Sequence, residues 1–275
     1  MTKRYVKKAG KLERILRGMG RVMIAFSGGV DSTFLLRFAC DCLGSENVVA
    51  FVERGPVYPG REIRFAAKFA SSLGVKTRMF TSLKLDKKAF SRNSPDRCFH
   101  CKHDLFGRMQ KTARTLKIKH LLDGSNADDK SDYRPGEKAK KLHGIRSPLQ
   151  EAGLTKQEIR ALSKEMNLPT WNKPAFACLA SRIPYGQTIT AERLARIGQA
   201  EEFLRGQKFS QVRVRDYETL CRIEVDPGDL DRVLAHRHRI VRQLKKIGYL
   251  HVALDLEGYS TGSMNRVLPC RASRG

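Results

Sequence analysis

The feature that most constrains the fold of this chain is a glycine-rich loop between an apolar run and a helix-forming run, at residues 22–38. Residues 22–26 are apolar and predict a buried strand, residues 27–32 read Ser-Gly-Gly-Val-Asp-Ser, and residues 33–38 favour a helix. Two adjacent glycines let the backbone turn sharply and approach a ligand closely. Because the first N–H groups of a helix lack intrahelical partners, the order strand, glycine turn, helix predicts a phosphate-binding loop.

This loop differs from two common phosphate loops. It lacks the Lys-Ser/Thr pair of a Walker A loop and the spaced glycines of a dinucleotide fingerprint. The hexapeptide instead resembles the PP-loop of the ATP pyrophosphatases, enzymes that split ATP into AMP and pyrophosphate to adenylate a substrate. The resemblance implies that Ser27, Gly28, Gly29 and Ser32 hold the pyrophosphate end of ATP, and that Asp31 orients Mg²⁺. The alternative is an ordinary glycine turn.

Strands and helices alternate along the first two thirds of the chain. Beyond the loop, residues 48–52, 76–80 and 120–123 are expected to form strands, with helices over residues 61–73 and 104–116. Such alternation predicts an α/β fold with a Rossmann-like parallel sheet that carries helices on both faces.

A second polar loop, residues 124–129, directly follows the expected strand over residues 120–123. Ligands of parallel α/β sheets bind at the carboxyl ends of the strands, so both loops are expected to converge on one edge. Asn126 and Asp128 are therefore candidates for contact with the nucleotide or with magnesium. An Asx-rich turn is the alternative interpretation of both residues.

The pattern changes near residue 187, where a helix and then several strands of a different rhythm follow. We therefore predict two domains. A PP-loop adenylation domain over residues 1–186 also carries the cysteine site described below, and a smaller α+β domain occupies residues 187–275.

Composition and charge indicate which binding partners and which cellular compartment to expect. The net charge of +25 favours a polyanionic partner such as RNA, but Lys and Arg are spread along the chain, so a solvated basic surface is the alternative. No apolar stretch approaches the roughly 20 residues that span a membrane, and the charged amino terminus lacks the apolar core of a signal peptide. We expect a cytoplasmic protein.

An odd number of cysteines in a chain without a secretion signal argues against a disulfide framework. Two of them stand at the end of the helix after the PP-loop and are expected to be structural, whereas those at positions 221 and 270 receive no role. The seven are Cys40, Cys42, Cys98, Cys101, Cys178, Cys221 and Cys270.

Cys98 and Cys101 form a Cys-x-x-Cys pair, a spacing used for zinc, for redox dithiols and for iron–sulfur clusters. No second such pair follows, and the remaining candidate partner is Cys178. Three thiolates would leave one iron of a cubane cluster without a protein ligand, and that iron could bind an exogenous sulfur atom. The spacing by itself leaves zinc and plain core thiols open.

Several segments together resemble the LarE family, the ATP-dependent sulfur transferases that build the pincer ligand of the nickel cofactor of lactate racemase. The resemblance runs from about residue 22 to about residue 268. Besides the PP-loop, the matching segments are residues 123–129, 132–136, 147–149, 171–174, 178–186, 212–215 and 254–259.

The resemblance implies a substrate and a sulfur source. Enzymes of this family adenylate the carboxylates of pyridinium-3,5-biscarboxylic acid mononucleotide and then install sulfur. One branch uses the cysteine that matches Cys178 as a sacrificial donor. In another branch three cysteines hold a 4Fe-4S cluster whose free iron carries the sulfide and is reloaded by sulfide or a sulfur donor. The presence of Cys98 and Cys101 beside Cys178 favours the cluster branch.

The resemblance also implies binding residues in the second half of the chain. Arg213 and Arg215 alternate along an expected strand and so point to one face, where two guanidinium groups suit the phosphate of the substrate. A solvated strand face is the alternative. Ser181 and Arg182, next to the sulfur-bearing Cys178, are expected to hold the adenylate.

Glu202 and Glu224 resemble acidic residues that bind a metal in the second domain of some family members. The family also implies a homo-oligomer assembled through that domain. A PP-loop tRNA thiolase with a three-cysteine cluster is the second functional hypothesis, favoured by the net charge of +25, although the segments after residue 130 resemble the nickel-cofactor enzyme more. A non-catalytic metal-binding protein is the third.

Overall fold

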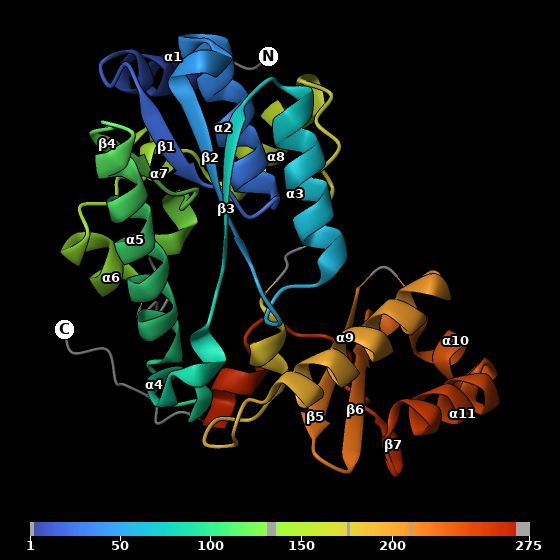
Figure 1. The fold of residues 1–275 in the computed structure, drawn as a ribbon. Coiled ribbons are helices and arrows are strands. Elements are labelled where there is room, and N and C mark those ends of the chain that lie inside the picture. The colour runs from blue at the N-terminus through green and yellow to red at the C-terminus, as the bar shows by residue number, and fades with distance from the viewer. Residues whose placement is uncertain (1–2, 131–135, 175–176, 210, 268–275) are drawn as a thin grey trace, which may run out of the picture. The chain divides into compact units, whose positions relative to one another are not determined.

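The computed structural model describes residues 3–130, 136–174, 177–209 and 211–267. The chain divides into two compact units, which do not follow its linear order (Figure 1). The first unit comprises Met1–Lys84 and Asp96–Phe176, and the second comprises Leu85–Pro95 and Ala177–Gly275. Cys270 and residues 132–135 of the 132–136 segment lie outside the described residues.

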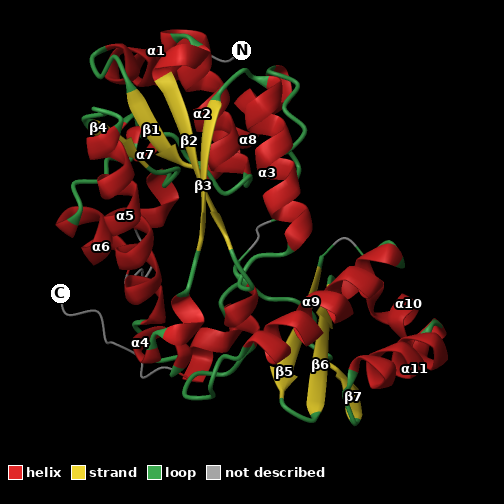
Figure 2. Ribbon diagram, viewed as in Figure 1, coloured by secondary structure: helices red, strands yellow, loops and turns green. Residues whose placement is uncertain are grey.

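The first unit contains a parallel sheet of four strands in the order β3-β2-β1-β4 (Figure 2). β1 is central, since Val22 is in register with Val48 on one side and His120 on the other. The predicted Rossmann-like parallel sheet is thereby confirmed. The strands are β1 (Val22–Ala25), β2 (Val48–Arg54), β3 (Lys76–Thr81) and β4 (His120–Leu122).

Helices cover both faces of this sheet. Successive side chains of β1 point to opposite faces, and the apolar side chains on each face pack against helices. Val22 and Ile24 belong to a core shared with α1, α2, α3 and α8, whereas Met23 packs in a second core with Phe106 of α5. The helices of the first unit are α1 (Lys3–Arg17), α2 (Val30–Leu43), α3 (Gly60–Ser72), α5 (Arg97–Thr115), α6 (Gly136–Leu142), α7 (Pro148–Glu151) and α8 (Lys156–Glu165).

The helix expected over residues 104–116 begins seven residues earlier than predicted, at Arg97. Phe99, near its start, packs against the core formed by Phe106 and its neighbours. Burial of this aromatic ring favours the extra helical turns. As a consequence, Cys98 and Cys101 lie on the first turns of α5.

The second unit contains a sheet of three strands in the order β5-β6-β7. β5 (Val212–Tyr217) and β6 (Leu220–Val225) are antiparallel, and β7 (His251–Leu254) is parallel to β6. Its core includes Leu204, Val214, Ile223 and Leu244. The helices of this unit are α4 (Lys88–Ser91), α9 (Ala191–Gly206), α10 (Leu230–Ala235) and α11 (Arg237–Ile247).

Short 3-10 helices connect several of these elements. No helix among the described residues combines the length and the apolar composition needed to cross a membrane. The 3-10 helices are η1 (Ser45–Asn47), η2 (Lys84–Asp86), η3 (Ala127–Lys130), η4 (Leu179–Arg182), η5 (Pro227–Asp229) and η6 (Ser263–Val267).

Gly28 and Gly124 lie where a side chain would make tight contacts. Gly28 has φ +70°, and a Cβ there would lie 3.0 Å from Cδ1 of Phe65. A Cβ on Gly124 would lie 3.0 Å from the backbone nitrogen of Ser32 and 3.1 Å from its Cα. The loop after β4 therefore runs directly against the first turn of α2.

We expect Gly124→Ala to lower the free energy of unfolding by about 1–3 kcal/mol, because the new methyl group meets backbone atoms of Ser32 that cannot move alone. Urea unfolding of the full chain measures this change. Gly10→Ala is the matched control: it lies within α1 with nothing inside 4 Å of the new Cβ, so its stability should rise slightly. Equal stabilities of Gly124→Ala and the unsubstituted chain would contradict the close approach.

Candidate active site

The phosphate loop occupies the predicted place, between the end of β1 and the first turn of α2. Ser27 is exposed, whereas Gly28 and Ser32 are buried. The hydroxyl oxygens of Ser27 and Ser32 are 3.1 Å apart, and Ser32 Oγ donates to the carbonyl oxygen of Gly29 at 3.2 Å. Gly29 is the N-cap residue of α2, and, having no side chain, it cannot cap the first N–H groups of that helix. The loop thus offers hydroxyl groups and the N-terminus of α2 to an anion.

Asp31 lies on the first turn of α2 and is contacted from two other segments. Lys156 Nζ donates to Asp31 Oδ2 at 2.7 Å, and Asn126 Nδ2 donates to the same oxygen at 3.4 Å. The other oxygen, Oδ1, is buried and accepts no hydrogen bond from any residue that the structure describes. An unused buried carboxylate oxygen beside a phosphate loop suits a hard cation such as Mg²⁺.

The second polar loop reaches the same place, as predicted from the strand order, and its side chains contact both the loop itself and other segments of the first unit. Asn126 is buried, and its Oδ1 accepts from the backbone N–H of Asp128 at 2.9 Å. Asp128 is exposed, and its Oδ2 accepts from the backbone N–H of Lys156 at 2.8 Å. The Asx turn is therefore present, and Asp128 fixes the start of α8. Contact of either residue with a nucleotide stays a prediction.

A network of buried polar side chains holds this loop in place. Asp123 accepts from Ser125 Oγ at 2.7 Å and from Ser147 Oγ at 2.6 Å. Lys140 Nζ donates to both serine hydroxyls, at 3.1 Å and 3.0 Å. Hydrogen bonds among buried groups of this kind order the backbone that carries them. The loop that contacts Asp31 is held by residues on β4, α6 and the segment before α7.

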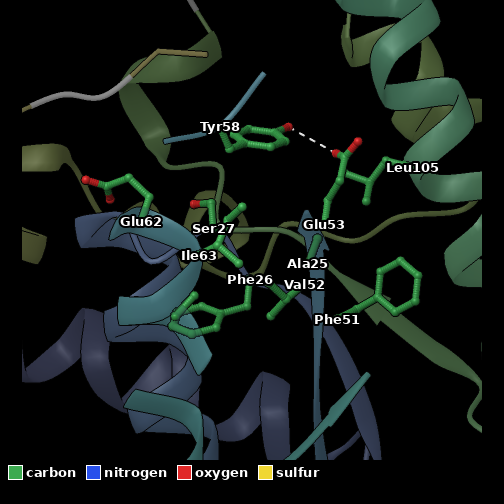
Figure 3. A pocket seen from close by; sticks show the side chains of 11 residues that line it. Ala25, Phe26, Ser27, Phe51, Val52, Glu53, Tyr58, Glu62, Ile63 and Leu105 are labelled. Carbon is green, nitrogen blue, oxygen red and sulfur yellow. Dashed lines mark hydrogen bonds between the residues drawn. The ribbon is translucent and has the colours of Figure 1, made fainter. Parts of the chain in front are cut away.

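A largely apolar pocket opens next to the phosphate loop, at the carboxyl ends of β1 and β2 (Figure 3). Its polar wall includes Glu53 and Tyr58, whose hydroxyl donates to Glu53 Oε2 at 3.0 Å. The remaining lining residues are Ala25, Phe26, Ser27, Phe51, Val52, Glu62, Ile63, Ala66 and Leu105. An apolar pocket that adjoins a phosphate loop suits the flat ring of a nucleotide base.

Sequence reasoning missed two lysines of this region. Lys156 has been described above, and Lys173 Nζ donates to the carbonyl oxygen of Gly28 at 2.9 Å and to Glu62 Oε2 at 2.5 Å. The same ammonium lies 4.4 Å from the ring centre of Phe65. Lys173 belongs to the segment 171–174 that carries the family resemblance, and this was the available signal for it.

The Cys-x-x-Cys pair lies in the first unit, with Cys98 exposed and Cys101 half-buried. Lys84 follows β3 and donates from Nζ to Cys101 Sγ at 2.9 Å. The same ammonium forms an ion pair with Glu53. A cation beside a sulfur atom favours the anionic sulfur that metals bind. No disulfide bond links the described cysteines.

In the second unit, Cys178 is half-buried and precedes the 3-10 helix that contains Ser181 and Arg182. The side chain of Arg182 is completely buried. Its Nη1 donates to the carbonyl oxygens of Ala177 and Cys178, at 2.6 Å and 3.0 Å, and to Ser181 Oγ at 3.0 Å. Arg182 therefore fixes the backbone around Cys178.

The positive charge of Arg182 is neutralised by a glutamate that the sequence analysis did not select. Glu201 on α9 is completely buried and accepts from Arg182 Nε at 2.8 Å and from Arg205 Nη2 at 2.6 Å. Burial would raise the pKa of Glu201, but Arg182 and Arg205 lower it to about 2. The acidic residue selected from the sequence, Glu202, is its exposed neighbour.

Arg213 and Arg215 are buried on β5, together with Glu224 on β6. Arg215 Nε donates to Glu224 Oε1 at 2.8 Å, and its Nη1 donates to the carbonyl oxygen of Ser181 at 3.1 Å. Burial, together with Arg182, lowers the pKa of Arg213 to about 10. Their burial excludes the solvated strand face.

Glu224 also accepts from Arg222 Nη2 at 3.1 Å. A metal bound there would compete with Arg215 and Arg222, so the pairing of Glu202 with Glu224 as metal ligands stays a prediction. Over the described ranges of the chain, no three His, Cys, Asp or Glu side chains lie close enough together to hold a metal ion.

The parallel sheet, the glycine loop after its central strand and the second polar loop define the PP-loop class of α/β nucleotide-binding enzymes. In agreement, the sequence model of the NAD synthase family matches residues 5–115.

The chain is 38% identical, over 95% of its length and 95% of the relative's, to the pyridinium-3,5-bisthiocarboxylic acid mononucleotide synthase of Lactiplantibacillus plantarum. It belongs to the LarE family, of which that synthase is a member. An uncharacterized protein of Synechocystis is 40% identical over 94% of this chain and 98% of its own length. An uncharacterized protein of Methanocaldococcus jannaschii is 30% identical over 93% of this chain and 98% of its own length.

The buried Glu201 predicts an acid-sensitive second unit. Its pKa falls from 4.5 in the unfolded chain to about 2, so the stability it contributes is present above about pH 4.5 and is lost as the pH falls toward about 2. The shift corresponds to about 3 kcal/mol. Glu201→Gln should therefore lower the free energy of unfolding at neutral pH. Between about pH 6 and pH 3 the free energy of unfolding of this variant, measured with urea, should change less than that of the unsubstituted chain.

Glu202→Gln is the control for this prediction, because the same substitution is made on an exposed neighbour. It should keep the neutral-pH stability and the acid dependence of the unsubstituted chain. If both variants behave alike, the ion pairs of Glu201 do not determine the acid sensitivity.

Proposed function

We propose that this protein is an ATP-dependent sulfur transferase that converts the carboxylates of pyridinium-3,5-biscarboxylic acid mononucleotide into thiocarboxylates. The observation that carries the proposal is the identity to the Lactiplantibacillus plantarum synthase along nearly the whole chain. A carboxylate is a poor electrophile, so it must first be activated. Its oxygen attacks the α-phosphorus of ATP and pyrophosphate leaves. Sulfur then attacks the acyl carbon, and the bond to AMP breaks.

The first unit is suited to the adenylation step. The hydroxyls of Ser27 and Ser32 and the N–H groups at Gly28 and Gly29 would hold the pyrophosphate end of ATP. The unpartnered Oδ1 of Asp31 fits a magnesium ion, which would offset the charge of the leaving pyrophosphate. The base of ATP would occupy the apolar pocket at the ends of β1 and β2.

The second unit is suited to the phosphate of the mononucleotide. Arg213 and Arg215 are buried, and arginine groups outnumber the carboxylates that face them, because Arg182 and Arg205 share Glu201. Burial lowers the pKa of Arg213, and the neighbouring positive charge of Arg182 lowers it further. A dianionic phosphate would offset this positive charge. We assign Ser181 and Arg182 to the adenylate, since both border Cys178.

For the sulfur source we propose that Cys98, Cys101 and Cys178 hold a 4Fe-4S cluster. The donor set fits, because thiolates are the usual ligands of such clusters and Lys84 provides positive charge at Cys101. When bound, the cluster would supply a sulfur atom that sulfide or another donor replaces after each turnover. Sacrifice of the Cys178 sulfur is the alternative source for the same reaction.

We further propose a cytoplasmic homo-oligomer assembled through the second unit, in keeping with the family resemblance. The second candidate function, a tRNA thiolase, is supported by the net charge of +25. The two candidates differ in the molecule that stimulates AMP release, which makes them separable in one assay.

The protein incubated with ATP, Mg²⁺, sulfide and the biscarboxylic mononucleotide should release AMP and pyrophosphate and form a thiocarboxylate detectable by mass spectrometry. Asp31→Asn should lower AMP release at least about tenfold, because the substitution removes a charge expected to hold the magnesium ion. Asp41→Asn, at an exposed position later in α2, should not. AMP release that needs bulk tRNA, with tight and steeply salt-dependent binding, would instead favour the tRNA thiolase.

Anaerobic purification should yield a coloured protein with about four irons and four acid-labile sulfides. Cys101→Ser should lose most of this iron, whereas Cys40→Ser, which changes a half-buried cysteine on α2, should keep it. A colourless protein with about one zinc would contradict the cluster. Conversion of Cys178 to dehydroalanine after one turnover, seen as a loss of mass, would indicate the sacrificial route.

A further inference from the structure

Lys84 is a buried lysine with an unusual environment. It is the first residue of η2, shortly after β3, and only 2% of it is exposed to solvent. Lysine is almost never buried to this extent unless its charge is paired, because removing an ammonium from water costs several kcal/mol. The position therefore calls for an explanation in terms of the groups that the ammonium contacts.

Three side chains surround the ammonium of Lys84. Its Nζ donates to Cys101 Sγ at 2.9 Å, forms an ion pair with Glu53, and lies 5.7 Å from the ring centre of Tyr58. The buried carboxylate of Glu53 thus pairs with the positive charge of the buried ammonium.

The Lys84 ammonium is itself held in place. Tyr58 donates its hydroxyl to Glu53 Oε2 at 3.0 Å, as the dashed line in Figure 3 shows. Glu53 stands near the end of β2 and is itself buried. Lys84 therefore bridges a carboxylate fixed on the sheet and a sulfur atom on α5. Such a bridge fixes both the direction of the ammonium and the distance to the sulfur.

Other cysteines of the chain have different surroundings. Burial raises the pKa of Cys40 and Cys42 to about 11 and that of Cys221 to about 12. These thiols are inert at neutral pH. The Cys101 sulfur, by contrast, accepts a hydrogen bond from a buried ammonium at 2.9 Å.

We propose that Lys84 is a positioning residue for Cys101: its buried ammonium, held by Glu53, orients the Cys101 sulfur and places a fixed positive charge next to it. The sulfur is then ready to bind a soft metal centre such as iron. The proposal deepens the proposed function, on which it rests for the identity of that centre. It also joins two parts of the first unit, because Glu53 lines the pocket beside the phosphate loop as well.

Alkylation of the full-length, metal-free protein by iodoacetamide at neutral pH tests the proposal without any bound cluster. Peptide mass spectrometry follows Cys101 and Cys98 in the same sample. The main variant is Lys84→Met with Glu53→Gln, which removes both buried charges together and leaves neither unpaired. The alkylation rate of Cys101 should fall by about tenfold or more, and that of Cys98 should stay within about twofold of its original value.

Two single variants keep the result interpretable if the double variant does not fold. Lys84→Gln keeps a hydrogen-bond donor but removes the charge, so Cys101 should again react more slowly. Lys84→Arg keeps the charge and should restore most of the rate. Lys76→Met, at an exposed position on β3, is the matched control and should leave both cysteines unchanged. An unchanged Cys101 rate in Lys84→Gln, or in the double variant where it folds, would overturn the proposal.

The cluster provides a second readout. If iron is bound, loss of a nearby positive charge should lower the reduction potential of the cluster, measured by a redox titration monitored by electron paramagnetic resonance. An unchanged potential in Lys84→Gln would also count against the proposal. A protein without iron would contradict the proposed cluster, and the alkylation result would still decide the role of Lys84.

Discussion

The candidate site of the first unit depends on the close approach of two backbone segments at the carboxyl ends of β1 and β4. A methyl group on Gly124 would lie only 3.0 Å from the backbone nitrogen of Ser32, which is a tight contact. This approach brings Asn126 to Asp31 and places Asp128 where it holds the first N–H group of α8. Lys156, the residue at that helix start, then reaches Asp31. The polar atoms around Asp31 are thus placed by packing of the main chain.

A second principle, common to both units, is that buried cations lie against buried carboxylates. In a chain of net charge +25, isolated burial of so many basic groups would be prohibitive. Paired burial contributes little to net stability, but it fixes the direction of each charge. Buried pairs of this kind include Lys84 with Glu53, Arg182 with Glu201, and Arg215 with Glu224.

These pairs serve the chemistry of the two units differently. Around the PP-loop, Lys156 contacts the carboxylate of Asp31 and Lys173 contacts the carbonyl oxygen of Gly28. In the second unit, Arg182 shares its glutamate with Arg205, so positive charge is left in excess next to Arg213. Excess buried charge of one sign favours a ligand of the other. Both features suit the sulfur transfer to a mononucleotide that we propose.

Much of this site could be predicted from the sequence, and there is a physical reason why the rest could not. The strand, loop and helix around residues 22–38, and the second loop at residues 124–129, follow from local steric preference, from apolar periodicity and from the rule that parallel strands end at one edge. Family motifs added Arg213 and Arg215, which the structure then showed to be buried.

The partners of these residues could not be predicted. Lys156 and Lys173 lie 125 and 145 residues away along the chain from the groups they contact. Glu201 differs by one position from the residue chosen from the sequence, a displacement of about 100° around a helix that separates a buried face from solvent. Lys84 carried no signal, since nothing in a single sequence pairs it with Cys101.

By itself, therefore, the sequence determined the fold class, the phosphate loop, the Cys-x-x-Cys spacing and the family. These depend on residues near one another in the chain or on motifs read as units. Only the tertiary structure decided which carboxylate neutralises which cation, and which cysteine has an ammonium beside its sulfur. Those choices are made by the packing of distant segments, because a buried charge is stable only where another segment brings its partner.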